Sequence, residues 1–253
     1  MDAISHFSDP RPVVVHIPHS SVFIPEESLE SYSRELIPKE LSLMTDLFCN
    51  EIFDIGFTSE VFLQSRLFCD VERFRSDEDE EMSALGMGVC YTLTSDGKTL
   101  RRLRSDEKEA ILCDDYDTHH KILESLVRSK LESHHSCLII DGHSFSNVPL
   151  AHERDQNPSR PDICLGTDSC HTPPSLAEHF RTAFENSGLK VKFNSPFAGT
   201  MVPVRYYHRN SDVFSIMIEI NRCLYLHSDG TKDQSSIKFL NKLIREATES
   251  ALI

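Results

Sequence analysis

Short apolar runs that end in polar clusters predict the strands of a buried sheet. Residues 13–17 are three valines, a histidine and an isoleucine, and Pro18 ends this run just before His19. A second run, 137–140, leads directly into Asp-Gly-His-Ser, which contains His143. Runs of this length and composition are typical of strands that are buried on both faces. Because ligands collect at the carboxyl ends of strands in an open α/β sheet, we expect the two histidines to face one site.

Helical and strand patterns alternate through the rest of the chain, which predicts an α/β fold. A long helix is expected from residue 105 to about 133, with its apolar residues on one side. Further helical segments are expected at 41–55, 173–187 and 234–252. Further strands are expected at 60–70, 162–166, 189–193 and 213–220.

Residues 75–104 interrupt this alternation. They hold an acidic run at 77–81, then Gly86 and Gly88, and a basic patch at 101–104. We interpret the segment as an excursion or flap, and the acidic run as a solvated face. No repeat and no low-complexity linker divides the chain, so the sequence predicts a single domain over residues 1–253.

The composition excludes several classes of protein. The formal net charge of −14 argues against binding to nucleic acids or to anionic membranes. No apolar run approaches the roughly 20 residues that span a bilayer, and no secretory signal is visible. The eight cysteines form no CxxC pair, which indicates reduced thiols in a cytoplasmic protein. An anionic small substrate stays compatible with this charge, because a few arginines in a cleft reverse the local field.

Glu219 interrupts the most apolar run of the chain, residues 213–220. A buried carboxylate needs a partner, because an isolated buried charge is very costly. One interpretation is a structural ion pair, for which Arg222 is the nearest candidate in the sequence. The other is a general base whose pKa is tuned by its surroundings.

His19 and His143 also have two interpretations. Each could be a hydrogen-bonded structural residue at a strand end, or both could bind a metal ion together with Asp46 or Asp141. Catalytic zinc takes three protein ligands and leaves one position for water. Asp141 precedes His143 by two residues, so in an extended chain it points the same way and is a candidate to orient that histidine.

Arg66 and Arg73 flank the end of the expected strand at 60–70. They could hold a substrate carboxylate or stabilise an oxyanion, or they could pair with the acidic run at 77–81. The hydroxyl of Ser144 lies beside a histidine in the sequence, but no G-x-S-x-G elbow supports a serine nucleophile.

These motifs together resemble the N-formylglutamate amidohydrolase (N-formylglutamate deformylase) family. The resemblance covers the chain from about residue 12 to residue 226. Each motif is short, so the specificity lies in the set and in its order. The matching pieces are His16-Ile-Pro-His19-Ser-Ser, Thr45-Asp46-Leu47, Ser65-Arg66 leading to Asp70 and Arg73, Asp141-Gly-His143-Ser144, Arg160-Pro-Asp162-Ile-Cys-Leu-Gly166 and Ile218-Glu219-Ile-Asn-Arg222-Cys-Leu-Tyr225.

The resemblance implies a fold and a metal site. The family is related to zinc carboxypeptidases and aspartoacylase-like deacylases, which implies a three-layer αβα sandwich around a central mixed sheet. It also implies one Zn²⁺ ion held by His19, Asp46 and His143, with Glu219 as the catalytic carboxylate. His16 is a competing ligand, because His16-x-x-His19 could mimic the His-x-x-Glu pair of related deacylases.

The implied reaction is the hydrolysis of an N-acyl amino acid, in the first place N-formyl-L-glutamate to formate and L-glutamate. The metal ion lowers the pKa of water, and Glu219 accepts the water proton and passes it to the leaving nitrogen. Arg66 is expected to stabilise the oxyanion. Arg73, Arg222 and Ser144 are expected to bind the substrate.

One departure from the family pattern concerns the substrate. The family's usual Asp-Leu-Asn-Arg is here Asp70-Val71-Glu72-Arg73. The negative charge of Glu72 would weaken binding of a dicarboxylate unless an arginine offsets it. Two alternatives therefore stay open: a zinc carboxypeptidase-like peptidase acting on short peptides, and a metal-binding relative without turnover. The sequence indicates no oligomeric state.

Overall fold

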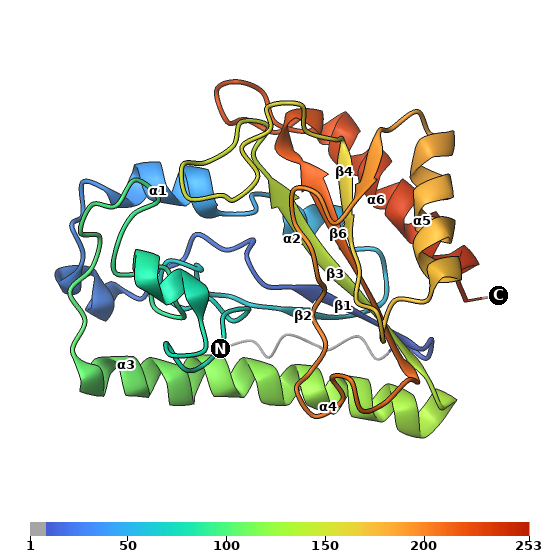
Figure 1. The fold of residues 1–253 in the computed structure, drawn as a ribbon, viewed down its shortest axis with the longest axis horizontal. Coiled ribbons are helices and arrows are strands. Elements are labelled where there is room, and N and C mark those ends of the chain that lie inside the picture. The colour runs from blue at the N-terminus through green and yellow to red at the C-terminus, as the bar shows by residue number, and fades with distance from the viewer. Residues whose placement is uncertain (1–8, 253) are drawn as a thin grey trace.

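A mixed sheet of six strands forms the centre of the computed structural model, which describes residues 9–252 (Figure 1). The strands are Val13–Ile17 (β1), Thr58–Val61 (β2), Cys137–Phe145 (β3), Ile163–Gly166 (β4), Val191–Phe193 (β5) and Val213–Asn221 (β6). Their spatial order is β2-β1-β3-β6-β4-β5. The first four in this order run parallel, β4 is antiparallel to β6, and β5 is parallel to β4.

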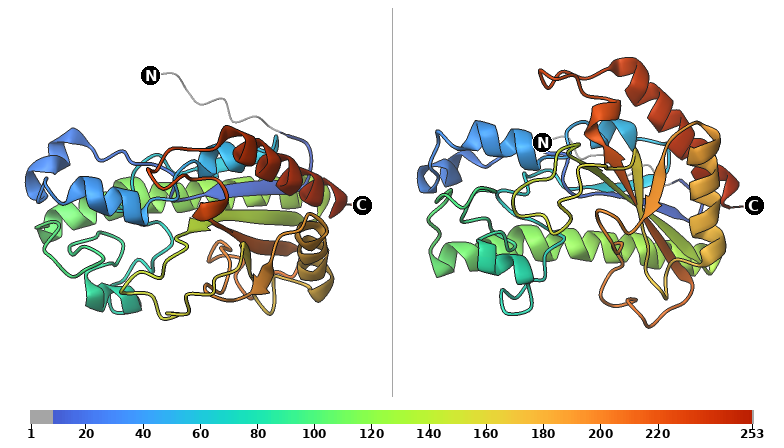
Figure 2. Two further views of the ribbon diagram at one scale, coloured as in Figure 1. Left: turned by 90° about the horizontal axis from the view of Figure 1, so that it is seen from above. Right: turned by 45° about the horizontal axis from the view of Figure 1, so that its top comes forward.

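Helices cover both faces of the sheet. They are Ile37–Met44 (α1), Cys49–Ile52 (α2), Ser105–Ile111 (α3), Asp117–His134 (α4), Pro174–Asn186 (α5) and Gln234–Ser250 (α6). Helix α4 packs along one face, whereas α2, α5 and α6 share an apolar cluster with the other (Figures 1 and 2). The expected three-layer αβα sandwich with a mixed central sheet is thus confirmed. None of the helices within residues 9–252 is long and apolar enough to cross a membrane.

The alternation of side chains along β1 decides which face of the sheet carries polar residues. The first, third and fifth residues of β1 pack into the cluster with α5 and α6, so Val14 and His16 face α4. Strand β3 lies beside β1 with Asp141 opposite His16. Both polar side chains therefore lie on the α4 face of the sheet, as does His143, two residues after Asp141.

The strand predicted over residues 60–70 is much shorter in the structure. Strand β2 ends at Val61, and the amides of Phe68 and Cys69 both donate to the Ser65 carbonyl, at 2.9 and 3.1 Å. This tight turn ends the extended conformation. The turn carries the following acidic and basic side chains toward the end of β1 instead of along the sheet.

The helical segment predicted over 41–55 is divided into α1 and α2. The division falls at Asp46, whose amide donates to the carbonyl of His19 at 2.9 Å. This bond replaces a helical one and ties the segment to the residue that follows β1. The helices predicted at 173–187 and 234–252 are confirmed as α5 and α6. The helix predicted over 105–133 corresponds to α3 and α4, joined by a π-helical turn, Leu112–Tyr116.

Residues 75–104 leave the sheet and lie on the side of the molecule away from α5 (Figure 1). They contribute to a separate apolar cluster, in which Met87, Val89, Tyr91 and Leu100 are at most 1% exposed. The segment that the sequence marks as an excursion is therefore anchored by buried side chains of its own.

Gly142 is expected to be intolerant of a side chain. It lies between the two polar residues of β3, and an added Cβ would lie 2.7 Å from the buried ring of Phe53. Overpacking of this kind costs about 1–3 kcal/mol. We therefore predict that Gly142→Ala lowers the free energy of unfolding by that amount, measured by urea denaturation. The Phe53→Leu substitution should lower the free energy of unfolding less in the Gly142→Ala variant than in the unmodified protein. If the losses of the two substitutions were strictly additive, the contact with Phe53 would be excluded as the cause.

Candidate active site

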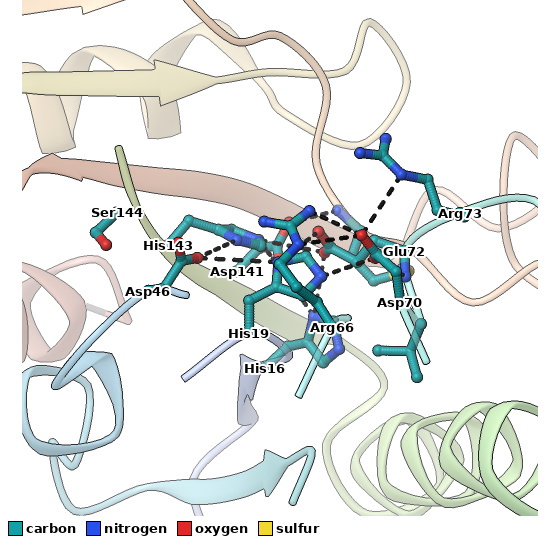
Figure 3. A network of polar contacts seen from close by, with 12 residues as sticks. His16, His19, Asp46, Arg66, Asp70, Glu72, Arg73, Asp141, His143 and Ser144 are labelled. Carbon is teal, nitrogen blue, oxygen red and sulfur yellow. Dashed lines mark hydrogen bonds and ion pairs between the residues drawn. The ribbon is translucent and has the colours of Figure 1, made fainter. Parts of the chain in front are cut away.

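The carboxyl ends of three parallel strands meet in one polar cluster (Figure 3). His19 follows β1, His143 lies in β3, and the register of the sheet sets Glu219 of β6 beside His143. The centroids of the His19 and His143 rings are 5.2 Å apart. The two histidines that end separate apolar runs in the sequence therefore face the same site.

His19 has one nitrogen that is bonded and one that is free. Its Nε2 lies 2.9 Å from Asp70 Oδ1, and Asp70 in turn accepts from Arg66 at 2.8 Å and from the Tyr91 hydroxyl at 2.9 Å. Burial opposes ionisation of Asp70, but Arg66 and His19 hold the pKa of this carboxyl well below its usual range. Asp70 is thus an acceptor, so His19 donates from Nε2 and carries a lone pair on Nδ1.

The free Nδ1 of His19 fits a metal ion. The residue is 2% exposed, and Nδ1 has no hydrogen-bond partner among residues 9–252. It lies 3.7 Å from Glu72 Oε2 and 3.9 Å from Asp46 Oδ2. A buried lone pair that faces two carboxylates has no donor to satisfy it, and a cation between these groups would supply the missing partner.

His143 is surrounded by carboxylates on both sides of its ring. Its Nδ1 lies 3.2 Å from Asp46 Oδ2, and its Nε2 lies 3.2 Å from Glu72 Oε1 and 3.1 Å from Asp141 Oδ1. Burial by itself would lower the pKa of His143, but Glu72 and Asp141 raise it well above its usual value. In this arrangement a proton on Nε2 occupies a position between carboxylates that a metal ion could take.

Glu72 forms a compact group with both histidines. One ligand atom each from His19, Glu72 and His143 lies within 4.8 Å of the other two. His16, Glu72 and Asp141 form a second group of this kind. The sequence marked Glu72 only as a departure from the family pattern, because nothing local indicates that its turn faces two strands.

Asp46 contacts the other nitrogen of the His143 ring. It is 2% exposed and forms an ion pair with Arg222 at 2.9 Å. Arg222 also donates to the Ser144 hydroxyl at 3.1 Å and to the Leu43 carbonyl at 2.6 Å. Arg222 thus holds Asp46 and Ser144 in place, and its contacts join β6, β3 and the end of α1.

Glu219 is buried and retains an unpartnered oxygen. It is 8% exposed, and its Oε2 has no hydrogen-bond partner in the part of the chain that the structure describes. Burial raises its pKa to about 8, although the nearby His143 opposes this shift. The ion pair with Arg222 that the sequence left open is not formed in the described structure, because Arg222 pairs with Asp46 instead. A carboxyl with this pKa and a free oxygen can accept and return a proton near neutral pH.

The two arginines of the 65–73 turn differ in how they are bound. Arg66 contacts Asp70 through both Nε and Nη2, at 3.2 and 2.8 Å. Arg73 approaches Asp70 through Nε alone, at 3.5 Å, and its terminal nitrogens point away from the cluster (Figure 3). Both arginines thus pair with Asp70 and not with the acidic run at 77–81. Arg73 keeps N–H donors that are available to an anion.

A cavity of about 680 Å³ opens onto this cluster. Its lining includes all eight site residues predicted from the sequence, and Glu72 besides. The predicted eight are His19, Asp46, Arg66, Arg73, His143, Ser144, Glu219 and Arg222. His16 is not among the described residues that line the cavity, because it lies behind Asp141, with its Nδ1 2.9 Å from Asp141 Oδ1.

Carboxylates outnumber arginines in this site by two. The carboxylates are Asp46, Asp70, Glu72, Asp141 and Glu219, and the arginines are Arg66, Arg73 and Arg222. Uncompensated charge in a buried site is costly, so the excess must be balanced by protons or by a cation. The raised pKa values of His143 and Glu219 indicate balance by protons when no ion is bound, and one divalent ion has the charge that replaces them.

Comparisons with known proteins agree with the geometry. The family model for N-formylglutamate amidohydrolase matches residues 11–226. No curated protein sequence matches the chain significantly. The fold is similar to that of an N-formylglutamate amidohydrolase from Ralstonia eutropha, with a TM-score of 0.82 and 20% identity over 95% of this chain and 92% of that one. It is also similar to a gene product of Agrobacterium tumefaciens, with a TM-score of 0.64 and 18% identity over 95% of this chain and 91% of that one.

The family match extends over most of the chain and includes every motif on which the resemblance was based. The structural matches show the same fold at low sequence identity. The resemblance drawn from the motifs is thereby confirmed, and the chain belongs to the N-formylglutamate amidohydrolase family of hydrolases, which act on an amide bond.

Proposed function

We propose that this protein hydrolyses the formyl amide of N-formyl-L-glutamate to formate and L-glutamate, and that it uses one zinc ion. The observation that carries the proposal is the buried, unpartnered Nδ1 of His19, which faces Glu72 beside His143 in a cavity that also contains Glu219. The cavity volume of about 680 Å³ is in the range that suits a small-molecule substrate.

Two histidines and one carboxylate would hold the ion. Imidazole and carboxylate ligands suit zinc, which leaves one position open in catalytic sites. The resemblance assigns the carboxylate to Asp46, whereas the geometry favours Glu72, with Asp46 on the opposite nitrogen of His143. If Glu72 is the ligand, Asp70 accepts the remaining N–H of His19 and Asp46 accepts that of His143. Ligand histidines are usually oriented in this way. When bound, the ion supplies Lewis acidity toward the formyl carbonyl and lowers the pKa of water.

Glu219 would carry the proton of the reaction. It takes a proton from the attacking water at its unpartnered Oε2 and passes it to the leaving nitrogen of the amide. Burial makes this carboxyl a better proton acceptor than an exposed glutamate, because desolvation disfavours its charged form. Arg66 lines the same cavity and would stabilise the negative charge that develops on the formyl oxygen.

Arg73 would bind a carboxylate of the substrate, because its terminal nitrogens point away from Asp70 and it lines the cavity. Ser144 lies next to the histidine and would add a hydroxyl contact, with Arg222 behind it. If Glu72 binds the ion, its charge is compensated there. The departure from the family's asparagine then no longer opposes a dicarboxylate substrate.

Three predictions test this proposal, and the first of them concerns the metal. Chelation should abolish formate release from N-formyl-L-glutamate and lower the melting temperature, since an ion that binds only the folded state stabilises it. Adding zinc should restore both. The measurements are enzymatic formate determination and differential scanning fluorimetry. Undiminished formate release from protein that elemental analysis shows to be free of metal would refute the metal requirement, and release of amino acids from dipeptides but not of formate would favour a peptidase.

The second prediction concerns Glu219. Glu219→Gln should reduce kcat by about 10²–10⁴-fold, because it removes the proton acceptor while keeping the shape of the side chain. Metal content measured by elemental analysis should stay unchanged. Glu81→Gln is the matched control, since Glu81 is exposed and lines the same cavity. Near-normal turnover of Glu219→Gln would show that another group moves the proton.

The third prediction separates the two candidate carboxylate ligands. If Glu72 binds the ion, Glu72→Gln should weaken zinc affinity more than Asp46→Asn, for which a loss of about 10–100-fold is expected from a group that only orients a ligand. Affinity is measured by competition with a chromophoric chelator. The reverse order of losses would assign the ligand to Asp46 and leave Glu72 as a neighbour of the site.

A further inference from the structure

A second pair of histidines lies behind the active site, between the sheet and α4. His16 on β1 is 0% exposed and His119 on α4 is 2% exposed. Their Nε2 atoms are 2.9 Å apart. The remaining nitrogen of His16, Nδ1, is hydrogen-bonded to Asp141 Oδ1 at 2.9 Å. His119 Nδ1 lies 3.2 Å from Glu60 Oε1 but forms no hydrogen bond within residues 9–252. These four side chains form a continuous buried row from β2 to β3.

The distances determine where the ring protons must be. Asp141 is held as an acceptor, because its other oxygen, Oδ2, accepts the amide of Met201 at 2.8 Å. His16 therefore donates to Asp141 from Nδ1, and its Nε2 is left as an acceptor. Two nitrogens 2.9 Å apart need one hydrogen between them, so this hydrogen belongs to His119 Nε2. His119 thus fixes the tautomer of His16 from the side of that ring opposite Asp141.

The row ends on the active site. Asp141 Oδ1, which accepts from His16, lies 3.1 Å from His143 Nε2. His143 Nε2 is the nitrogen that would face the ion, so Asp141 lies beside the ion position. The place of its carboxylate depends on His16 and then on His119. Coupling of this kind passes through direct contacts and needs no movement of the backbone.

The surroundings of the row are apolar, so its polar groups are not explained by stability. Val14, Leu123, Val127 and Ile139 pack together on the same face of the sheet. Apolar side chains in place of a buried polar row would often stabilise a fold equally well or better. A π-helical turn lies just before α4. Such turns are rare in proteins overall but common at functional sites, which supports a functional role for this row. The rings of Phe62 and His119 are packed in a T-shaped arrangement, with 5.2 Å between their centroids.

We propose that His119 is a positioning residue that fixes the tautomer of His16 and, through His16, the position of the Asp141 carboxylate beside His143. The effect on turnover rests on the function proposed above. The hydrogen bonds themselves are observable without substrate.

The test compares His119→Phe, which removes the donor, with His119→Gln, which keeps an N–H donor on a side chain of similar reach. In His119→Phe we expect kcat for N-formyl-L-glutamate to fall by about 10–100-fold with little change in KM, as for other groups that orient ligands. His119→Gln should recover most of this loss. His120→Gln is the matched control, because the adjacent histidine contacts the Val71 carbonyl and lies outside the row.

Nitrogen NMR of the histidine rings tests the row independently of catalysis. In the unmodified protein His16 should be protonated on Nδ1 and His119 on Nε2, and the His16 tautomer should change or become mixed in His119→Phe. A folded His119→Phe with unchanged kcat, or a His16 ring protonated on Nε2 in the unmodified protein, would overturn the proposal. If the unmodified protein released no formate while the ring tautomers were as expected, the proposed substrate would be wrong and the row would stand.

Discussion

An excess of buried negative charge is the constraint on which the site depends. Five carboxylates and three arginines meet at the carboxyl ends of β1, β3 and β6, and the uncompensated charge must be balanced by protons or by a cation. The raised pKa values of His143 and Glu219 are the response of the protein without an ion. The same excess makes the site a good receptor for one divalent ion, whose charge replaces those protons.

The irregular parts of the fold supply most of these charges. The turn after β2 presents Arg66, Asp70 and Glu72, and the break between α1 and α2 presents Asp46. Regular continuation of either element would have carried these side chains away from the histidines. The sheet supplies the rigid part, because parallel register sets His143 beside Glu219. Local departures from regular structure at this site are thus tied to its chemistry.

The histidines of the site form two layers. His19 and His143 face the cavity, and each has a carboxylate on the nitrogen away from Glu72. His16 and His119 lie behind them and reach the site through Asp141. Arrangements of this kind fix which nitrogen is free to bind an ion, which is what a metal site requires of its ligand rings.

Local sequence patterns were enough to predict most of the helices and strands and to recognise the family. Apolar runs, helical periodicity and strand-end histidines are properties of neighbouring residues, so they predicted most helices and strands and brought His19, His143 and Glu219 to notice. Two contacts could not be predicted in this way and arise from the folded arrangement: Glu72 faces both site histidines, and His119 meets His16, 103 residues away in the chain. Those contacts depend on the strand order β2-β1-β3 and on the position of α4 across it. Strand order and helix position are set by the packing of the whole apolar core, and no short stretch of sequence encodes them.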